Sequence, residues 1–173
     1  MSITKEDLVK RYGMLPHPEG GFYAETFRSE VTVQTEKGSR AASTAIYFLM
    51  SPGNISRLHR IVSDEVWHFY LGHSITVVEL DDTTGGFKST ILGNNITNGE
   101  VVQYVVKGGT WFGSFPNIDS DDSNKDAFSF VGCTVSPGFD FADFEMGSNA
   151  ALRKAYPAAA EYGIIDKLTV GLP

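Results

Sequence analysis

The chain has 173 residues, of which 42% are hydrophobic and 20% charged, as is typical of a single globular domain with a sizeable core. Its formal net charge is −7 and it contains no basic run, which argues against a surface that binds nucleic acid through phosphates. The single cysteine, Cys133, excludes an internal disulfide framework and a zinc finger.

The N-terminal residues MSITKEDLVKRYG contain no apolar signal core, and no apolar run in the chain approaches membrane-spanning length. We therefore expect a cytoplasmic protein without a membrane partner. In the same segment Thr4 and Asp7 have the spacing of a capping box, and an apolar face ends at Gly13. This pattern predicts a helix over residues 4–12.

The segment LPHPEGG then breaks the chain, and short β-branched and aromatic segments with a period of two follow it. They read FYAETFRS, VTVQT, STAIYFLM, RLHRI, EVWHFYL, SITVVEL, FKSTIL, EVVQYVV, TWFGSF and AFSFVGCTV. Turn residues separate them, as in EKGS, SPGN, DDTTGG, GNNITNG and KGG. About ten short strands at this spacing predict an all-β sandwich or closed barrel rather than βαβ units.

Two further segments complete the pattern. The acidic NIDSDDSNKD predicts a solvated loop, since it lacks the central glycine and final glutamate of a hand-type calcium loop. The C-terminal NAALRKAYPAAAEYG predicts a helix up to Ala155, which Pro157 interrupts. We find no internal repeat and no linker between domains.

The stretch GNISRLHRIVSDEVWHFYLG, residues 53–72, resembles the first cupin motif, G-x5-H-x-H-x3-E-x6-G. Gly53, His59, Glu65 and Gly72 occupy the matching positions, whereas Ile61 replaces the second histidine. In KGGTWFGSFP, which resembles the second cupin motif, Phe112 stands at the histidine position.

The segments LPHPEGGFYAETFRS, SDEVWHFYLG and GCTVSPGFDFADFE together resemble the Cupin-5 group, a domain of unknown function. This resemblance covers nearly the whole chain and implies a cupin-type β-barrel, or jelly roll, that is usually a homodimer. We expect one domain over residues 1–173. It would comprise a helix and a swapped-type strand segment in 1–35, a barrel in 43–145 and a helical tail in 147–165.

A fainter resemblance links GGFYAETF and LHRI to segments of dTDP-sugar 3,5-epimerases, which are cupin-like dimers. It implies that Glu25 and Arg28 lie near a ligand and that His59 is a general base. Those enzymes take a tyrosine acid from a late strand, but AFSFVGCTV contains no tyrosine. Tyr47, on another strand, is the candidate replacement.

His59 and Glu65 are the candidate catalytic residues. Alternation within a strand places His59 and Ile61 on one face, and we expect Glu65 and Trp67 to point into the same interior. An imidazole beside a carboxylate suits general acid–base catalysis, with Glu65 orienting His59. The alternative is a satisfied polar pair that plugs the mouth of the barrel.

A metal site is not expected. A catalytic zinc or iron site normally needs three protein ligands, and Ile61 and Phe112 cannot donate to a metal. We therefore expect no metal and no other cofactor.

Five residues are candidates for ligand binding. Strict alternation separates Glu25 from Arg28, so only a bulge would bring both to one ligand; an exposed salt bridge is the alternative. Trp111 and Phe112 could stack on a base or sugar or belong to the core, and Tyr47 completes the set. Cys133 is expected to be a small buried hydrophobe.

The leading hypothesis is therefore a cupin that binds a sugar or nucleotide-sugar and isomerises or epimerises it without a metal. The first alternative is a non-catalytic ligand-binding or sensing barrel. The second is a metal-dependent sugar-phosphate isomerase. Catalytic and non-catalytic hypotheses both stay open at this point.

Overall fold

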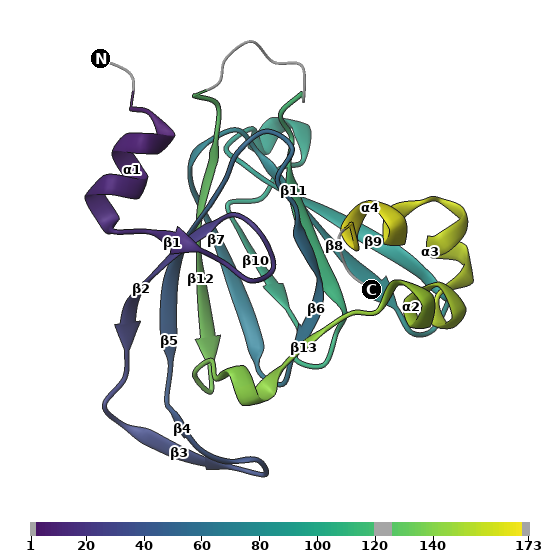
Figure 1. Ribbon diagram of the computed structural model, residues 1–173, viewed down its shortest axis with the longest axis horizontal. Coiled ribbons are helices and arrows are strands. Elements are labelled where there is room, and N and C mark those ends of the chain that lie inside the picture. Colours follow the sequence, from purple (N-terminus) through teal and green to yellow (C-terminus); the bar gives the residue numbers. More distant parts are fainter. Residues whose placement is uncertain (1–2, 120–125, 171–173) are drawn as a thin grey trace.

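The computed structural model describes residues 3–119 and 126–170, and two antiparallel sheets face each other at its centre (Figure 1). The six-stranded sheet contains, in spatial order, β1 (Leu15–Pro16), β2 (Phe22–Arg28), β5 (Thr44–Met50), β12 (Ser129–Ser136), β7 (Asp64–Gly72) and β10 (Gln103–Val106). The five-stranded sheet contains β13 (Phe144–Met146), β6 (Ser56–Ile61), β11 (Phe112–Pro116), β8 (Ile75–Asp81) and β9 (Gly86–Leu92). The expected all-β jelly-roll barrel is confirmed.

A separate hairpin of β3 (Thr32–Thr35) and β4 (Gly38–Ala41) extends away from the barrel (Figure 1). The sequence pattern indicates only a turn, EKGS, where β4 begins. The three-residue β13, which pairs with β6, was likewise not expected as a strand. Both segments are too short to display a period of two, so neighbouring strands rather than local pattern define them.

The short helices lie near the two ends of the chain, as expected. Helix α1 (Lys5–Tyr12) begins with the predicted capping box of Thr4 and Asp7 and ends at Gly13, whose φ is +58°. The C-terminal part forms α2 (Asn149–Ala155), α3 (Pro157–Glu161) and α4 (Ile164–Leu168). Helix α2 ends at Ala155 as predicted, because Pro157 cannot continue it and instead begins α3. Two 3-10 turns complete the elements: η1 (Ile96–Asn98) and η2 (Phe141–Asp143).

Three hydrophobic clusters hold these layers together. The largest fills the space between the two sheets and includes Phe48, Trp67 and Phe112. The second lies between the outer face of the five-stranded sheet and helices α2–α4, which Figure 1 shows beside β8 and β9. The third joins α1 to the outer face of the six-stranded sheet. Helices thus cover parts of both outer faces and leave the inner faces to form the barrel.

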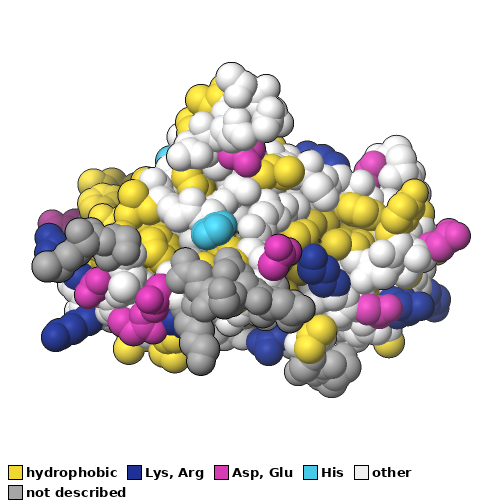
Figure 2. All heavy atoms as spheres, turned by 90° about the horizontal axis from the view of Figure 1, so that it is seen from above, with side chains coloured by type: hydrophobic (Ala, Val, Ile, Leu, Met, Phe, Trp, Pro, Cys, Tyr) yellow, Lys and Arg dark blue, Asp and Glu magenta, His cyan; other side chains and the backbone are white. Residues whose placement is uncertain are grey.

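The outer surface carries charges of both signs, which are interspersed on the face seen in Figure 2. Within residues 3–119 and 126–170, no helix has the length and apolar character needed to cross a bilayer. Most of the acidic segment NIDSDDSNKD, predicted to be a solvated loop, lies outside the described residues.

Candidate functional site

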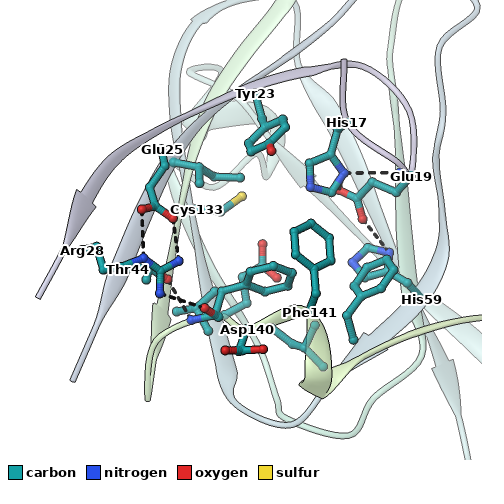
Figure 3. A pocket seen from close by; sticks show the side chains of 16 residues that line it. His17, Glu19, Tyr23, Glu25, Arg28, Thr44, His59, Cys133, Asp140 and Phe141 are labelled. Atoms are coloured by element: carbon teal, nitrogen blue, oxygen red, sulfur yellow. Dashed lines mark hydrogen bonds and ion pairs between the residues drawn. The ribbon is translucent and has the colours of Figure 1, made fainter. Parts of the chain in front are cut away.

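A cavity of about 320 Å³ opens between the two sheets, which is within the range of small-molecule sites (Figure 3). The six-stranded sheet supplies one wall, the five-stranded sheet the other, and the segments before β2 and after β12 close the sides. The lining residues are His17, Glu19, Tyr23, Glu25, Arg28, Thr44, Ile46, His59, Ile61, Glu65, Cys133, Val135, Phe139, Asp140, Phe141 and Phe144.

His59 lies on β6 and is only 3% exposed. Its Nδ1 lies 2.6 Å from the carbonyl oxygen of Arg57 and 2.8 Å from Oε2 of Glu19. Both neighbours accept hydrogen bonds, so we assign the hydrogen to Nδ1. The second ring nitrogen, Nε2, is then left for the cavity, towards which it points in Figure 3.

Glu19 comes from the segment HPEGG, whose backbone requires glycine. Gly20 has φ +118°, and a Cβ there would lie 2.0 Å from the carbonyl oxygen of Ile55. Because this close approach is possible, the backbone N–H of Arg57 donates to the Glu19 carbonyl at 2.9 Å. The loop is thereby fixed to β6, two residues before His59.

The charges of Glu19 and His59 stabilise each other. Burial is the largest single influence on His59 and would lower its pKa, but the charge and hydrogen bond of Glu19, the Arg57 carbonyl and the charge of Glu65 together raise the pKa of His59 above its usual value. Burial is also the largest influence on Glu19 and would raise its pKa, but the charge and hydrogen bond of His59, the charge of His17 and the Ser56 hydroxyl together lower the pKa of Glu19. The pair therefore favours an imidazolium beside a carboxylate.

His17 is the second imidazole of the cavity. Its Nδ1 accepts a hydrogen bond from the Glu19 backbone N–H at 3.3 Å, so in the neutral ring the hydrogen lies on Nε2. Burial lowers the pKa of His17, which favours this neutral form. The edge-to-face contact of its ring with Tyr23, at 4.7 Å between centroids, fixes the ring plane.

Glu65 lies on β7, in the wall opposite His59, because β6 and β7 belong to different sheets. It is 8% exposed, and burial raises its pKa to about 7, with a smaller contribution from the Glu19 charge. The Cys133 thiol is its hydrogen-bonding neighbour, and Glu65 in turn contributes to the raised pKa of that buried thiol. Glu19, not Glu65, makes the direct contact with His59. This corrects the expected role of Glu65 in orienting His59: the charges of Glu65 and His59 interact, but Glu19 is the carboxylate 2.8 Å from the imidazole.

Glu25 and Arg28 lie together at the cavity. The pairing of β2 with β5 shifts register between Glu25 and Phe27, and this bulge brings both side chains to the same side. Arg28 donates through Nε and Nη2 to Glu25, at 2.9 and 2.7 Å, and both side chains are 40–46% exposed. The structure therefore combines the two expected alternatives: a bulge, and an ion pair that is partly exposed.

Three expected ligand-binding residues do not line the cavity. Tyr47 follows the inward-facing Ile46 on β5, so it points to the outer face, where its ring packs 4.6 Å from that of Tyr12. Trp111 lies in the cluster beneath the C-terminal helices, with the Arg60 guanidinium 4.7 Å from its ring. Phe112 is buried in the barrel core, with its ring 4.2 Å from that of His59. Trp111 and Phe112 thus belong to hydrophobic clusters, the alternative to ligand stacking, and only the expected placement of Tyr47 at the cavity is corrected.

The sequence alone pointed to neither Glu19 nor His17. In the sequence, HPEGG indicates a chain break and belongs to the family resemblance. The feature that could have identified Glu19 as a site residue is its position directly before two glycines, because glycines allow the backbone to approach another strand closely.

The donor set does not fit a cupin metal site. Ile61 and Phe112 occupy two of the usual ligand positions, and His59 already directs Nδ1 at a carbonyl and a carboxylate. Across residues 3–119 and 126–170, no group of three or more His, Cys, Asp or Glu side chains is arranged to hold a metal ion.

Two facing antiparallel sheets around a polar-lined cavity define this protein as a cupin. More specifically, the chain belongs to the family Cupin_5, described as "Cupin superfamily (DUF985)", whose model matches residues 6–147.

Similar proteins are known from several organisms. The uncharacterized protein YML079W from Saccharomyces cerevisiae is 34% identical over an alignment of 152 residues, and the match covers 80% of this chain and 72% of that protein. The solved structure of protein SO0799 from Shewanella oneidensis is 36% identical, with a TM-score of 0.84 and coverage of 96% and 98%. A hypothetical protein from Leishmania major gives 36% identity, a TM-score of 0.85 and the same coverage.

A more distant match belongs to the enzymes of the fainter resemblance, those that act on dTDP-sugars. The dTDP sugar isomerase of Desulfovibrio desulfuricans is 13% identical and has a TM-score of 0.52, with 78% of this chain and 88% of that chain covered. At this level of identity the match shows a shared fold alone.

Proposed function

We propose that the protein binds a sugar or the sugar part of a nucleotide-sugar in this cavity and catalyses a metal-independent proton transfer, as in isomerisation or epimerisation. One observation carries the proposal: His59 and Glu65 approach the same cavity from opposite walls. A volume of 320 Å³ corresponds to about ten water molecules at ~30 Å³ each, which suits a sugar ring. A nucleotide would have to lie beyond the mouth.

The chemistry follows from the protonation states of the two residues. In its neutral form His59 presents the Nε2 lone pair to the cavity and can accept a proton from carbon next to a carbonyl. Glu65, with a pKa of about 7, is half protonated near neutral pH and can donate a proton from the opposite side. A base and an acid on opposite faces are what inversion at one carbon requires.

Glu19 is a positioning residue in this mechanism. It keeps the hydrogen on Nδ1 of His59 and stabilises the imidazolium that forms when Nε2 takes a proton. Glu65, which was expected to orient His59, is instead proposed as the proton-transfer partner.

Solvent-deuterium exchange into bound sugars tests the proposal. We expect exchange to fall by about 10²–10⁴-fold in His59→Asn, the usual contribution of a general base. His68→Asn is the matched control, because His68 hydrogen-bonds Thr134 on the outer face of the sheet and does not line the cavity. Equal loss in both variants would contradict the proposed role of His59.

Two alternatives are outcomes of the same experiments. Sugar binding that survives His59→Asn without any exchange would identify a non-catalytic ligand-binding or sensing barrel. Stoichiometric zinc, iron or manganese in the purified protein would favour a metal-dependent sugar-phosphate isomerase. A thermal-shift screen over sugars, sugar phosphates and nucleotide-sugars selects the ligand, because a specific ligand stabilises the folded state by mass action.

We further propose that the protein acts as a cytoplasmic homodimer without nucleic-acid or membrane partners. The net charge of −7 supports the absence of a nucleic-acid surface. The family resemblance supports the homodimer and the exchange of the strand segment in residues 1–35 between its two subunits. In the single chain described here, β2 pairs with β5 of the same chain.

A further inference from the structure

The charges that line the cavity are unequally balanced. Arg28 is its one lysine or arginine among the described lining residues, and each of its three guanidinium nitrogens already donates a hydrogen bond. Nε and Nη2 donate to Glu25, and Nη1 donates to the carbonyl oxygen of Phe139 at 3.2 Å. An anionic ligand would therefore compete with Glu25 for Arg28.

The carboxylates are less well compensated. Glu25 is paired with Arg28 and Glu19 with His59, whereas Glu65, among the described residues, has the Cys133 thiol as its hydrogen-bonding neighbour and interacts with the charge of His59 without a direct ion pair. Asp140 adds a fourth carboxyl group to the lining and interacts with the charge of Arg28. The cavity thus has two internally neutralised pairs and two further carboxyl groups.

Glu19 also presents an acceptor whose nearby donors, Nδ1 of His59 and the Ser56 hydroxyl, are poorly aligned with it. Its side chain is 8% exposed, and Oε2 has no aligned hydrogen-bond donor among the described residues. The reason is geometric: Oε2 lies 2.8 Å from Nδ1 of His59, but that nitrogen directs its hydrogen at the carbonyl of Arg57. A buried carboxylate oxygen of this kind favours a ligand that brings N–H or O–H groups.

Aromatic rings line another side of the cavity. Phe139, Phe141 and Phe144 contact one another edge to face, with centroid distances of 5.0–6.1 Å, and Tyr23 lies beside His17 (Figure 3). The faces of such rings attract ammonium groups. Aromatic faces and unpaired carboxylates therefore favour the same ligand charge.

We propose that the ligand of this cavity is a small organic cation: a hydroxylated, sugar-sized molecule that carries a protonated amine, which pairs with Glu65 in its carboxylate form. In the same complex the protonated form of Glu65 is the one that donates a proton. The hydroxyl groups supply donors to Oε2 of Glu19. This inference rests on the proposed function for the sugar-like size of the ligand, but it specifies a cationic class in place of phosphorylated sugars.

Titration calorimetry at pH 7 with glucosamine, glucose and glucose 6-phosphate tests the proposal. These three probes share one ring and differ in charge. We expect glucosamine to bind at least tenfold more tightly than glucose, and glucose 6-phosphate to bind most weakly. The proposal is overturned if glucose 6-phosphate binds most tightly, if glucose equals glucosamine, or if glucosamine does not bind.

Two variants test which carboxylate causes the preference of the cavity for a cationic ligand. Glu65→Gln should reduce the preference for glucosamine over glucose to threefold or less, because the amine then loses its carboxylate. Glu25→Gln should leave that preference intact and increase the affinity for glucose 6-phosphate, since it releases Arg28. A tenfold preference that persists in a folded Glu65→Gln protein, checked by circular dichroism, would contradict the assigned pairing.

Failure of this inference and failure of the proposed function are distinguishable. Tight glucosamine binding without solvent-deuterium exchange would retain the cation site and reject catalysis. Deuterium exchange into glucose 6-phosphate, with no preference for the amine, would retain proton transfer and reject the cation site.

Discussion

The smallest unit that explains the site is the contact between Glu19 and His59. A histidine alone on the inner face of a strand would lose charge on burial, because desolvation disfavours the imidazolium. The 2.8 Å contact with Glu19 reverses that tendency. Glu65 lacks such a partner and keeps a raised pKa of about 7. The pKa values of both buried residues are raised, but because of Glu19 this favours the charged form of His59, whereas it favours the neutral form of Glu65.

Removal of the Glu19 charge should lower the pKa of His59. In Glu19→Gln the imidazole stays buried while the ion pair disappears, so the pKa of His59 should fall below the wild-type value. NMR titration of the imidazole measures this directly. Glu25→Gln is the control, since Glu25 pairs with Arg28 and should leave the His59 titration unchanged.

Glu65 should make the protein less stable as the pH rises. Its pKa is raised from 4.5 to about 7 in the folded protein, so the folded state binds more protons than the unfolded state between these values. Stability is greatest below the unfolded pKa and falls until the pH exceeds the folded pKa, by about 3 kcal/mol in total.

Glu65→Gln should remove this decline. We expect denaturant unfolding to show a larger stability gain for the variant at pH 8 than at pH 5. An equal gain at both pH values would contradict the raised pKa of Glu65 in the folded protein.

Two irregular backbone elements bring the site residues together. The HPEGG loop approaches β6 closely enough for Arg57 to hydrogen-bond the Glu19 backbone. The β2 bulge turns Glu25 and Arg28 to the same side, although regular alternation would separate them. Both elements depart from the regular strand pattern, and both position charged groups at the cavity.

The close approach of the HPEGG loop to β6 depends on Gly20, and Gly53 provides a matched comparison. In Gly20→Ala the new Cβ would lie 2.0 Å from the Ile55 carbonyl oxygen at φ +118°, so we expect a loss of about 2–4 kcal/mol in the free energy of unfolding. Gly53 also has a positive φ, +75°, but a Cβ there would meet no atom within 4 Å. Gly53→Ala should therefore cost only about 1 kcal/mol.

Chemical denaturation of both alanine variants gives the comparison. Equal losses would show that the close approach of the loop to β6 contributes nothing beyond the strain of a positive φ.

At the scale of the whole molecule, the barrel places the two proton-transfer candidates on opposing sheets. The strands β6 and β7 are consecutive in sequence, yet β6 pairs with β11 and β13 while β7 pairs with β10 and β12. The short connection between them therefore crosses from one wall to the other. Because of this crossing, side chains from both sheets line the cavity. A hairpin within one sheet would have supplied only one wall.

The outer face of the six-stranded sheet is where we expect a second copy of the chain. Tyr70 and Val105 are 45% and 40% exposed there. Analytical ultracentrifugation should give twice the mass of the 18.9 kDa chain, and Tyr70→Glu should shift the protein towards the monomer. Tyr162→Glu, at an 81% exposed tyrosine on the helical tail, should leave the mass unchanged. A monomeric wild-type protein would contradict the expected homodimer.

The sequence by itself determined the features that depend on local pattern. Alternating apolar segments gave the all-β class, Thr4 and Asp7 gave the start of α1, and Pro157 gave the end of α2, because each acts within a few residues. Motif spacing gave the family, and alternation correctly placed Ile61 on the same inward face as His59.

The tertiary structure decided which residues meet. Glu19 and His59 are forty residues apart in sequence, and their contact depends on a glycine loop that lies against another strand. Local pattern also could not assign Tyr47 and Trp111 to outer faces or divide His59 and Glu65 between two walls. Such contacts follow from how the strands close into a barrel, and the free energy that fixes them comes from packing between segments far apart in the chain.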